Sequence, residues 1–159
     1  MIYDITSQWD VPLMVTRGYP SLSYLLEAAE AIKAKDKPTH IYYPGDFDPS
    51  GVDIPRKVEA DLRRMAPESE IHFTRLAVTE DQIDTWHLPT RPTKTSDSRA
   101  KAFGSRSVEV DAIPSRVLRG FVELHVKMHT DNAQLEVLET AERSERQRLN
   151  EITQQWGQQ

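Results

Sequence analysis

The chain has 159 residues, a length that can bury the core of one domain. Of these residues 38% are hydrophobic and 28% are charged, as in an ordinary globular protein. Its 20 basic and 25 acidic side chains leave a net charge of −5, which argues against a protein that coats DNA without sequence preference. The lack of cysteine excludes disulfides and thiolate metal sites, and no apolar run approaches the roughly 18 residues that span a bilayer. The N-terminus also lacks the features of a signal peptide, so we expect a cytoplasmic protein without membrane contact.

The first third of the chain predicts two strands separated by a helix. The apolar run of residues 11–16 predicts a buried strand. Ser21 is a suitable N-cap for the helix that follows, in which apolar residues recur at helical spacing. Residues 39–43, rich in β-branched and aromatic side chains, predict a second buried strand.

The next segments continue the alternation. Residues 44–50 predict a loop, and residues 54–65 predict a helix that tolerates Pro55 in its first turn. Residues 71–76 alternate between apolar and polar and predict a third strand, after which Thr79 caps a short helix. The order βαβαβα with short connections predicts an α/β domain built on a parallel sheet.

The second half of the chain is more polar. Residues 87–107 predict a loop in which basic residues outnumber acidic ones, and residues 108–112 predict a short strand. Pro114 opens a further helix, and Asp131 is a plausible cap for a long polar helix over residues 131–156. We therefore expect an α/β domain over residues 1–130 and a helical extension over residues 131–159. This helix is predicted to be solvated, and its alternative role is to bind a partner subunit or a second copy of the chain.

Two aspartates follow the second predicted strand. Asp46 and Asp48 lie in the stretch "GDFDPSG", at the carboxyl end of a strand, where ligands collect in parallel α/β sheets. Residues i and i+2 of an extended loop project to the same side, and two close carboxylates favour a hard divalent cation such as Mg²⁺. On spacing alone, turn formation or helix capping is the commoner role of such a pair. Asp53 is expected to cap the helix that begins at Ile54.

The same stretch resembles a known family. "GDFDPSG" after a buried strand is similar to the Asp-x-Asp motif of Toprim domains, most closely of the type found in the A subunit of topoisomerase VI and in meiotic double-strand-break proteins. "VTRGYPS", one predicted strand earlier, resembles the basic Gly-Tyr-Pro stretch of that group. The segment from "LPTRPTKTSDSRAKAF" to "SVEVDAIP" is similar to the tails of bacterial and phage Toprim-like proteins. The resemblance covers roughly residues 11–121 and implies a three-layer, Rossmann-like Toprim fold.

The resemblance also implies a function. It indicates a Mg²⁺ or Mn²⁺ site, with Asp46 and Asp48 as metal ligands, used in cleavage, joining or nucleotidyl transfer at nucleic-acid phosphodiesters. DNA is the expected partner, and the expected chemistry is topoisomerase-like (an isomerase) or that of a nuclease. Arg17, Arg91 and Lys94 are candidates for contact with the phosphate backbone. For each of these three residues, a plain solvated side chain is the alternative interpretation.

Two departures from the family pattern bear on activity. Toprim domains also use a glutamate at the end of an earlier strand, and the residues before position 11 contain no glutamate. Either the natural protein begins upstream of Met1, or the chain is a piece of a larger protein, or the site is incomplete. Topoisomerase VI and its relatives cut DNA with a tyrosine of a separate winged-helix domain, for which this chain has no room. The alternative function is therefore a non-catalytic module that binds metal, DNA or a protein partner through a degenerate Toprim site.

Overall fold

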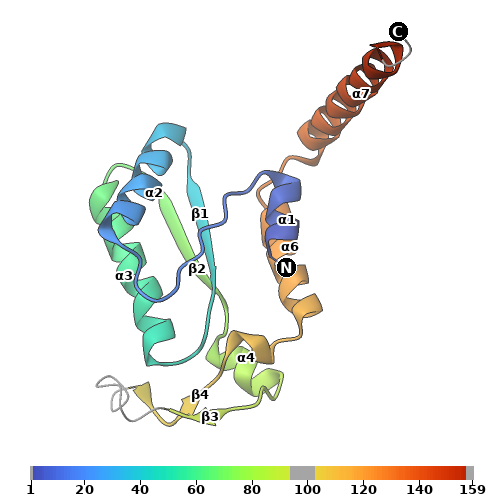
Figure 1. Ribbon diagram of the computed structural model, residues 1–159. Helices are drawn as coiled ribbons and strands as arrows, with labels where there is room; N and C mark the ends of the chain where they lie inside the picture. Colours follow the sequence, from blue (N-terminus) through green and yellow to red (C-terminus); the bar gives the residue numbers. More distant parts are fainter. Residues whose placement is uncertain (1, 94–102, 157–159) are drawn as a thin grey trace. The chain divides into compact units, whose positions relative to one another are not determined.

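The computed structural model describes residues 2–93 and 103–156, and the chain divides into two compact units, Met1–Val122 and Glu123–Gln159. The first unit is a mixed α/β structure with a two-stranded parallel sheet and surrounding helices (Figure 1). The α/β class predicted from the sequence is therefore confirmed. The prediction of a Toprim-like domain over residues 1–130 with an extension over residues 131–159 stays a prediction.

The parallel sheet forms from the second and third predicted strands. Strand β1 (Thr39–Pro44) pairs with β2 (Ile71–Ala77), with Thr39 opposite Ile71 and a register shift at the carboxyl end, where Pro44 lies opposite Ala77. Helix α3 (Pro49–Met65) connects the two strands, so the three elements form a βαβ unit.

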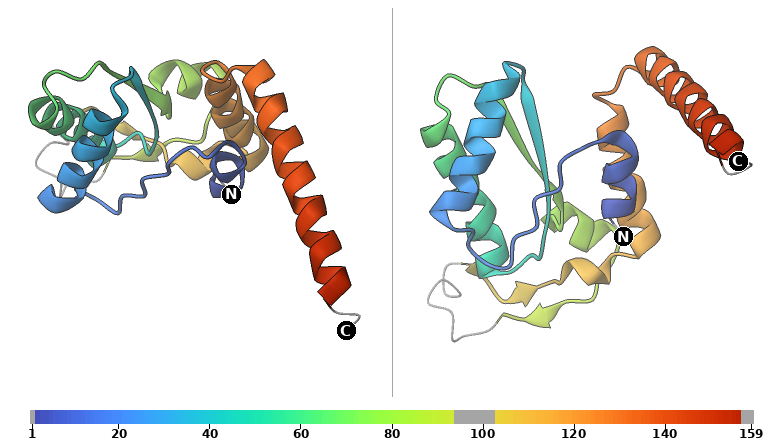
Figure 2. Two further views of the ribbon diagram at one scale, coloured as in Figure 1. Left: turned by 90° about the horizontal axis from the view of Figure 1, so that it is seen from above. Right: turned by 45° about the horizontal axis from the view of Figure 1, so that its top comes forward.

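Helices α2 (Leu22–Lys35) and α3 lie on one face of this sheet (Figures 1 and 2). Ser21 caps α2 as predicted, because its side chain accepts a hydrogen bond from the backbone N–H of Tyr24 at 3.2 Å. The buried side chains between the helices and the sheet form one core cluster, which consists of Leu25, Ala29, Ile32, Leu62, Ala66 and Ile71. This cluster anchors the βαβ unit that positions the aspartates.

The opposite face of the sheet carries exposed side chains. His72 and Thr74 of β2 alternate with its inward-facing side chains and are exposed. A three-layer arrangement needs helices over both faces of the sheet. The two described strands are covered on one face, so the three-layer Toprim fold remains a proposal.

The predicted strand over residues 11–16 is wrong. The chain begins with α1 (Tyr3–Thr6) and the 3-10 helix η1 (Ser7–Trp9), and the next residues run past the sheet without forming a strand (Figure 1). Four apolar side chains of this segment are exposed by 36% to 68%: Val11, Leu13, Met14 and Val15. A strand requires a neighbour for its backbone hydrogen bonds, and among the described residues β1 and β2 pair only with each other. An apolar run alone does not supply that neighbour.

The segments after β2 confirm some predictions and correct others. Thr79 and Gln82 form a capping box at the start of α4 (Glu80–Thr85), as the Thr79 cap predicts. The predicted loop over residues 87–107 is wrong in part, because Arg91–Pro92 (β3) and Arg106–Ser107 (β4) pair as antiparallel strands. The predicted strand over residues 108–112 is also wrong: Val108 forms a single bridge with Phe47, and Val110–Ala112 is a 3-10 helix, η2.

Helix α6 (Ser115–Lys127) follows Pro114, as predicted. A second core cluster joins the end of β2, α4, the bridge at Val108 and α6, and it consists of Ala77, Val78, Ile83, Leu88, Val108, Ile113 and Leu118. This cluster lies next to the carboxyl ends of the strands and supports the loop that carries the aspartates.

Helix α7 (Asn132–Trp156) belongs to the second unit and matches the long polar helix predicted over residues 131–156. No helix in the described part of the chain combines the length and the apolar character that crossing a bilayer requires.

Candidate functional site

Asp48 is the N-cap of α3. Its backbone is extended, and its Oδ1 accepts a hydrogen bond from the backbone N–H of Gly51 at 2.6 Å. Helix α3 therefore begins at Pro49, so the prediction that Asp53 caps a helix starting at Ile54 is wrong. The pair Asp48-Pro49 is a signal for this start that the sequence carried, because proline is favoured in the first turn after a capping aspartate.

Asp46 binds a segment far away in the sequence. Its Oδ1 accepts a hydrogen bond from the backbone N–H of Val110 at 2.8 Å. Next to it, the N–H and C=O groups of Phe47 bond to the C=O and N–H groups of Val108 at 2.7 and 2.9 Å. The two aspartates thus have separate structural tasks: Asp46 holds residues 108–110 and Asp48 starts α3.

Two glycines allow the chain to turn tightly around these aspartates. A Cβ atom at Gly51 would collide with the backbone oxygen of Asp46, and one at Gly45 would lie 2.5 Å from the ring of Tyr43. At Gly51 the neighbour is backbone, which cannot swing away as a side chain can. The first turn of α3 therefore lies against the Asp46 peptide in a way that only glycine permits.

Arg75 of β2 holds the loop together, and sequence reasoning missed it. Its guanidinium donates hydrogen bonds to four backbone carbonyl groups: those of Val78 at 2.7 Å, Gly51 at 2.8 Å, Gly45 at 3.0 Å and Asp46. The rigid fork of an arginine suits such multiple recognition. The only signal in the sequence was a basic residue in the middle of a strand.

Arg75 also supplies positive charge next to the two aspartates. Burial lowers the pKa of its guanidinium, while its electrostatic interactions with Tyr43, Asp46 and Asp48 act in the opposite direction. Burial raises the pKa of the Tyr43 phenol. The charge of Arg75 lowers this pKa, and the charges of the two aspartates raise it further. Arg75 is therefore a resident cation that interacts with both aspartates.

One oxygen of each aspartate remains outside this network. Asp46 and Asp48 each use Oδ1 for a structural hydrogen bond, and Oδ2 of each accepts no hydrogen bond from the described residues. The described residues contain no cluster of three or more His, Cys, Asp or Glu side chains that could hold a metal ion. Mg²⁺ takes oxygen ligands and keeps several waters, so the two carboxylates are donors of the kind that this cation binds.

The residues predicted to bind phosphate do not gather around the two aspartates in the described part of the chain. Arg17 is exposed in the segment before α2. Arg91 is exposed too, but it forms an ion pair with Glu109 at 2.7 Å. Lys94 lies outside the described residues. The contacts of the described residues do not bring Arg17 or Arg91 to the aspartates.

A small polar cluster ties the segment around Arg17 to α3. The Tyr19 hydroxyl donates a hydrogen bond of 2.6 Å to Asp53, and the ammonium group of Lys57 lies 4.6 Å from the centre of the Tyr19 ring. Asp53 also accepts hydrogen bonds from Arg56. The Tyr19 hydroxyl and Arg56 hold the pKa of Asp53 well below its usual range.

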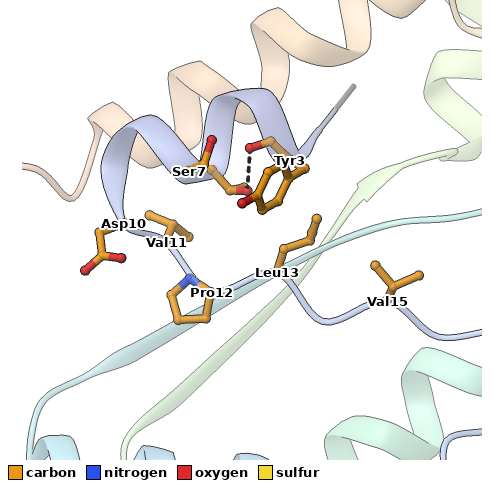
Figure 3. Close-up of a pocket in the computed structure, with 8 residues that line it drawn as sticks. Tyr3, Ser7, Asp10, Val11, Pro12, Leu13 and Val15 are labelled. Carbon is orange, nitrogen blue, oxygen red and sulfur yellow. Dashed lines mark hydrogen bonds between the residues drawn. The ribbon is translucent and has the colours of Figure 1, made fainter.

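A pocket lies elsewhere, between the N-terminal helices and the segment that follows them (Figure 3). It has a volume of about 490 Å³. Its lining residues are Tyr3, Thr6, Ser7, Asp10, Val11, Pro12, Leu13 and Val15. The Thr6 hydroxyl donates a hydrogen bond to the Tyr3 carbonyl at 3.3 Å beside the pocket. None of the residues predicted to bind metal or phosphate lines it.

Comparison of the chain with protein-family models finds no match, and searches of curated proteins and solved structures find none either. The Toprim resemblance therefore depends on the motif residues themselves.

Proposed function

We propose that the chain is a Toprim-type domain that binds one Mg²⁺ or Mn²⁺ ion at Asp46 and Asp48 and acts on nucleic-acid phosphodiesters, as a nuclease or in topoisomerase-like chemistry. The observation that carries the proposal is the remaining oxygen on each aspartate, in a loop fixed at the carboxyl end of a parallel strand. The bound cation would supply positive charge to phosphate oxygens. The chain's own contribution is to hold the two carboxylates in place through Arg75 and Gly51.

Isothermal titration of Mg²⁺ and Mn²⁺ tests the metal site. The informative variant is Asp46→Asn/Asp48→Asn, because asparagine keeps an oxygen for the Val110 and Gly51 amides and is as good an N-cap as aspartate. We expect binding to the wild type and none to the double variant. Equal heats from both proteins would refute the site.

Asp36→Asn/Asp81→Asn is a matched control, since it removes two exposed carboxylates elsewhere in the first unit. Asparagine also tolerates the left-handed backbone at residue 36. This control should bind metal like the wild type. Loss of binding in the control would mean that overall charge, and not the aspartate loop, attracts the cation.

Metal-dependent nicking of supercoiled DNA tests the chemistry. We expect activity with Mn²⁺ or Mg²⁺ that the Asp46→Asn/Asp48→Asn variant lacks. Nicking that survives in that variant would show that the chemistry belongs to another site or to a contaminant.

A second candidate is a non-catalytic module that binds metal or DNA. It is favoured by the lack of a third acidic or histidine group beside the pair among the described residues. The same assays separate the two functions: the module binds metal and retains DNA without nicking it. Arg17→Ala would then weaken DNA binding equally for all sequences and reduce its salt dependence, as expected for a phosphate contact.

A further inference from the structure

Helix α7 presents apolar side chains to solvent. Every side chain from residue 140 to residue 154 is exposed, including Leu149 at 64% and Ile152 at 46%. Most helices in proteins derive their stability from packing an amphipathic face against something else. The exposed apolar residues of α7 therefore call for a partner.

The sequence of α7 follows a heptad pattern. The positions that correspond to a two-helix seam, spaced alternately by three and four residues, are 135, 138, 142, 145, 149, 152 and 156. Apolar residues occupy the two ends of this stripe: Leu135 and Leu138 first, then Leu149, Ile152 and Trp156. Glu142 and Glu145 interrupt it in the middle. A partner must therefore offer apolar residues at two separate places along its length.

Charge is divided unequally along the same helix. The acidic residues Glu136, Glu139 and Glu142 precede the first basic residue. The following half carries three arginines, at positions 143, 146 and 148, and two glutamates, at positions 145 and 151. An antiparallel second copy would place the acidic half of one helix beside the arginine-bearing half of the other. A parallel second copy would place the two acidic halves beside each other and the two arginine-bearing halves beside each other.

We propose that α7 pairs with α7 of a second copy of this chain as an antiparallel two-helix coiled coil. Aligning the seam positions brings residue 135 opposite residue 152 of the second copy and residue 138 opposite residue 149. This register gives four apolar layers, two on each side of two central layers in which Glu142 lies opposite Glu145 of the second copy. It also sets Glu139 beside Arg146 of the second copy, twice by symmetry, whereas a parallel pair forms no such contact.

Sedimentation across a dilution series tests the association. The intact chain should approach twice its 18.2 kDa mass as concentration rises. The seam variant Leu149→Asp/Ile152→Asp should remain a monomer. Its matched control, Gln147→Asp/Gln154→Asp, adds the same two charges on the opposite side of the helix and should associate like the wild type. A wild type that stays monomeric, or a seam variant that still dimerises, overturns the proposal.

Mixing charge variants tests the orientation and does not depend on the seam variant folding. Glu139→Arg puts arginines at both flanking positions, and Arg146→Glu puts glutamates at both. Each variant alone should dimerise about tenfold more weakly, because two ion pairs become two repulsions. An equimolar mixture should recover the wild-type affinity as a heterodimer. Unchanged association of each variant alone, or no recovery on mixing, would refute the antiparallel register.

Discussion

Two short stretches of this chain each carry a clear structural signal in the sequence, but the structure holds only one of them in place by contacts with distant residues. Residues 45–51, which carry the aspartates, are fixed by hydrogen bonds from Arg75, by the bridge to Val108 and by a helix cap. Residues 11–16 form no strand, and their apolar side chains are largely exposed. The difference shows that a stretch adopts a defined shape when distant residues satisfy its backbone, whatever its own propensity.

Replacing Gly51 should break the ordered stretch most severely. Gly51→Ala drives a Cβ into the backbone oxygen of Asp46, so we expect a loss of about 3 kcal/mol in the free energy of unfolding, measured by urea denaturation. Gly120→Ala is the matched control, because a Cβ there meets nothing within 4 Å and the residue lies inside α6. It should stabilise the protein by about 0.5–1 kcal/mol. Similar values for the two variants would contradict the tight approach at Gly51.

Arg75→Lys should have the next largest effect. A lysine cannot bond all four carbonyl groups at once, and we expect a cost of about 2–3 kcal/mol from those left without a partner. The same substitution at Arg64, an exposed residue of α3, should change stability by less than about 0.5 kcal/mol. If denaturation curves show both variants to be neutral, Arg75 does not hold the loop.

The same substitution, made in the core beside residues 45–51 and within residues 11–16, compares the packing of the two regions. Val78→Ala removes a fully buried side chain next to the aspartate loop and should cost about 2 kcal/mol. Val15→Ala changes a side chain that is 68% exposed and should cost less than about 0.5 kcal/mol. Equal costs in thermal or urea unfolding would mean that residues 11–16 are packed after all.

The smallest effect concerns a contact just beyond the two regions, in which the Tyr19 hydroxyl donates a hydrogen bond to Asp53. Because folding lowers the pKa of Asp53, its ionised form stabilises the protein above the unfolded pKa of about 3.9, and this contribution is lost as the pH falls further. Asp53→Asn removes the titrating group. Stability measured from neutral to acidic pH should therefore decline more steeply in the wild type than in this variant. If the stability of the two proteins falls with pH in parallel, the hydrogen bonds from Tyr19 and Arg56 do not stabilise the ionised form of Asp53.

Local signals predicted the elements whose causes are local. The Ser21 and Thr79 caps, and the strands at residues 39–43 and 71–76, are all found, because capping and alternation act within a few residues. The start of α3 was predicted wrongly, although the neighbouring residues Asp48 and Pro49 are a local signal for a helix start.

The remaining errors involve partners distant in sequence. The short strands β3 and β4 exist through pairing with each other, and the role of Arg75 depends on carbonyl groups 24 to 30 residues earlier in the chain. For the candidate site, the sequence identified the two aspartates as a pair. It could not show that Asp46 is also a structural hydrogen-bond acceptor, because Val110 lies 64 residues beyond Asp46, whereas the bond of Asp48 to the Gly51 amide is local. Such contacts are fixed by tertiary packing and leave no periodic trace in the sequence.

The cap on α3 has a practical consequence for detecting a ligand. The Gly51 amide donates its hydrogen bond to Asp48, one of the two residues proposed to attract the cation. A cation bound to that carboxylate withdraws electron density from the oxygen that the amide meets. The chemical shift of a single backbone nitrogen and its proton can therefore report occupancy in an ordinary two-dimensional spectrum. The loop contains its own spectroscopic probe, without any added label.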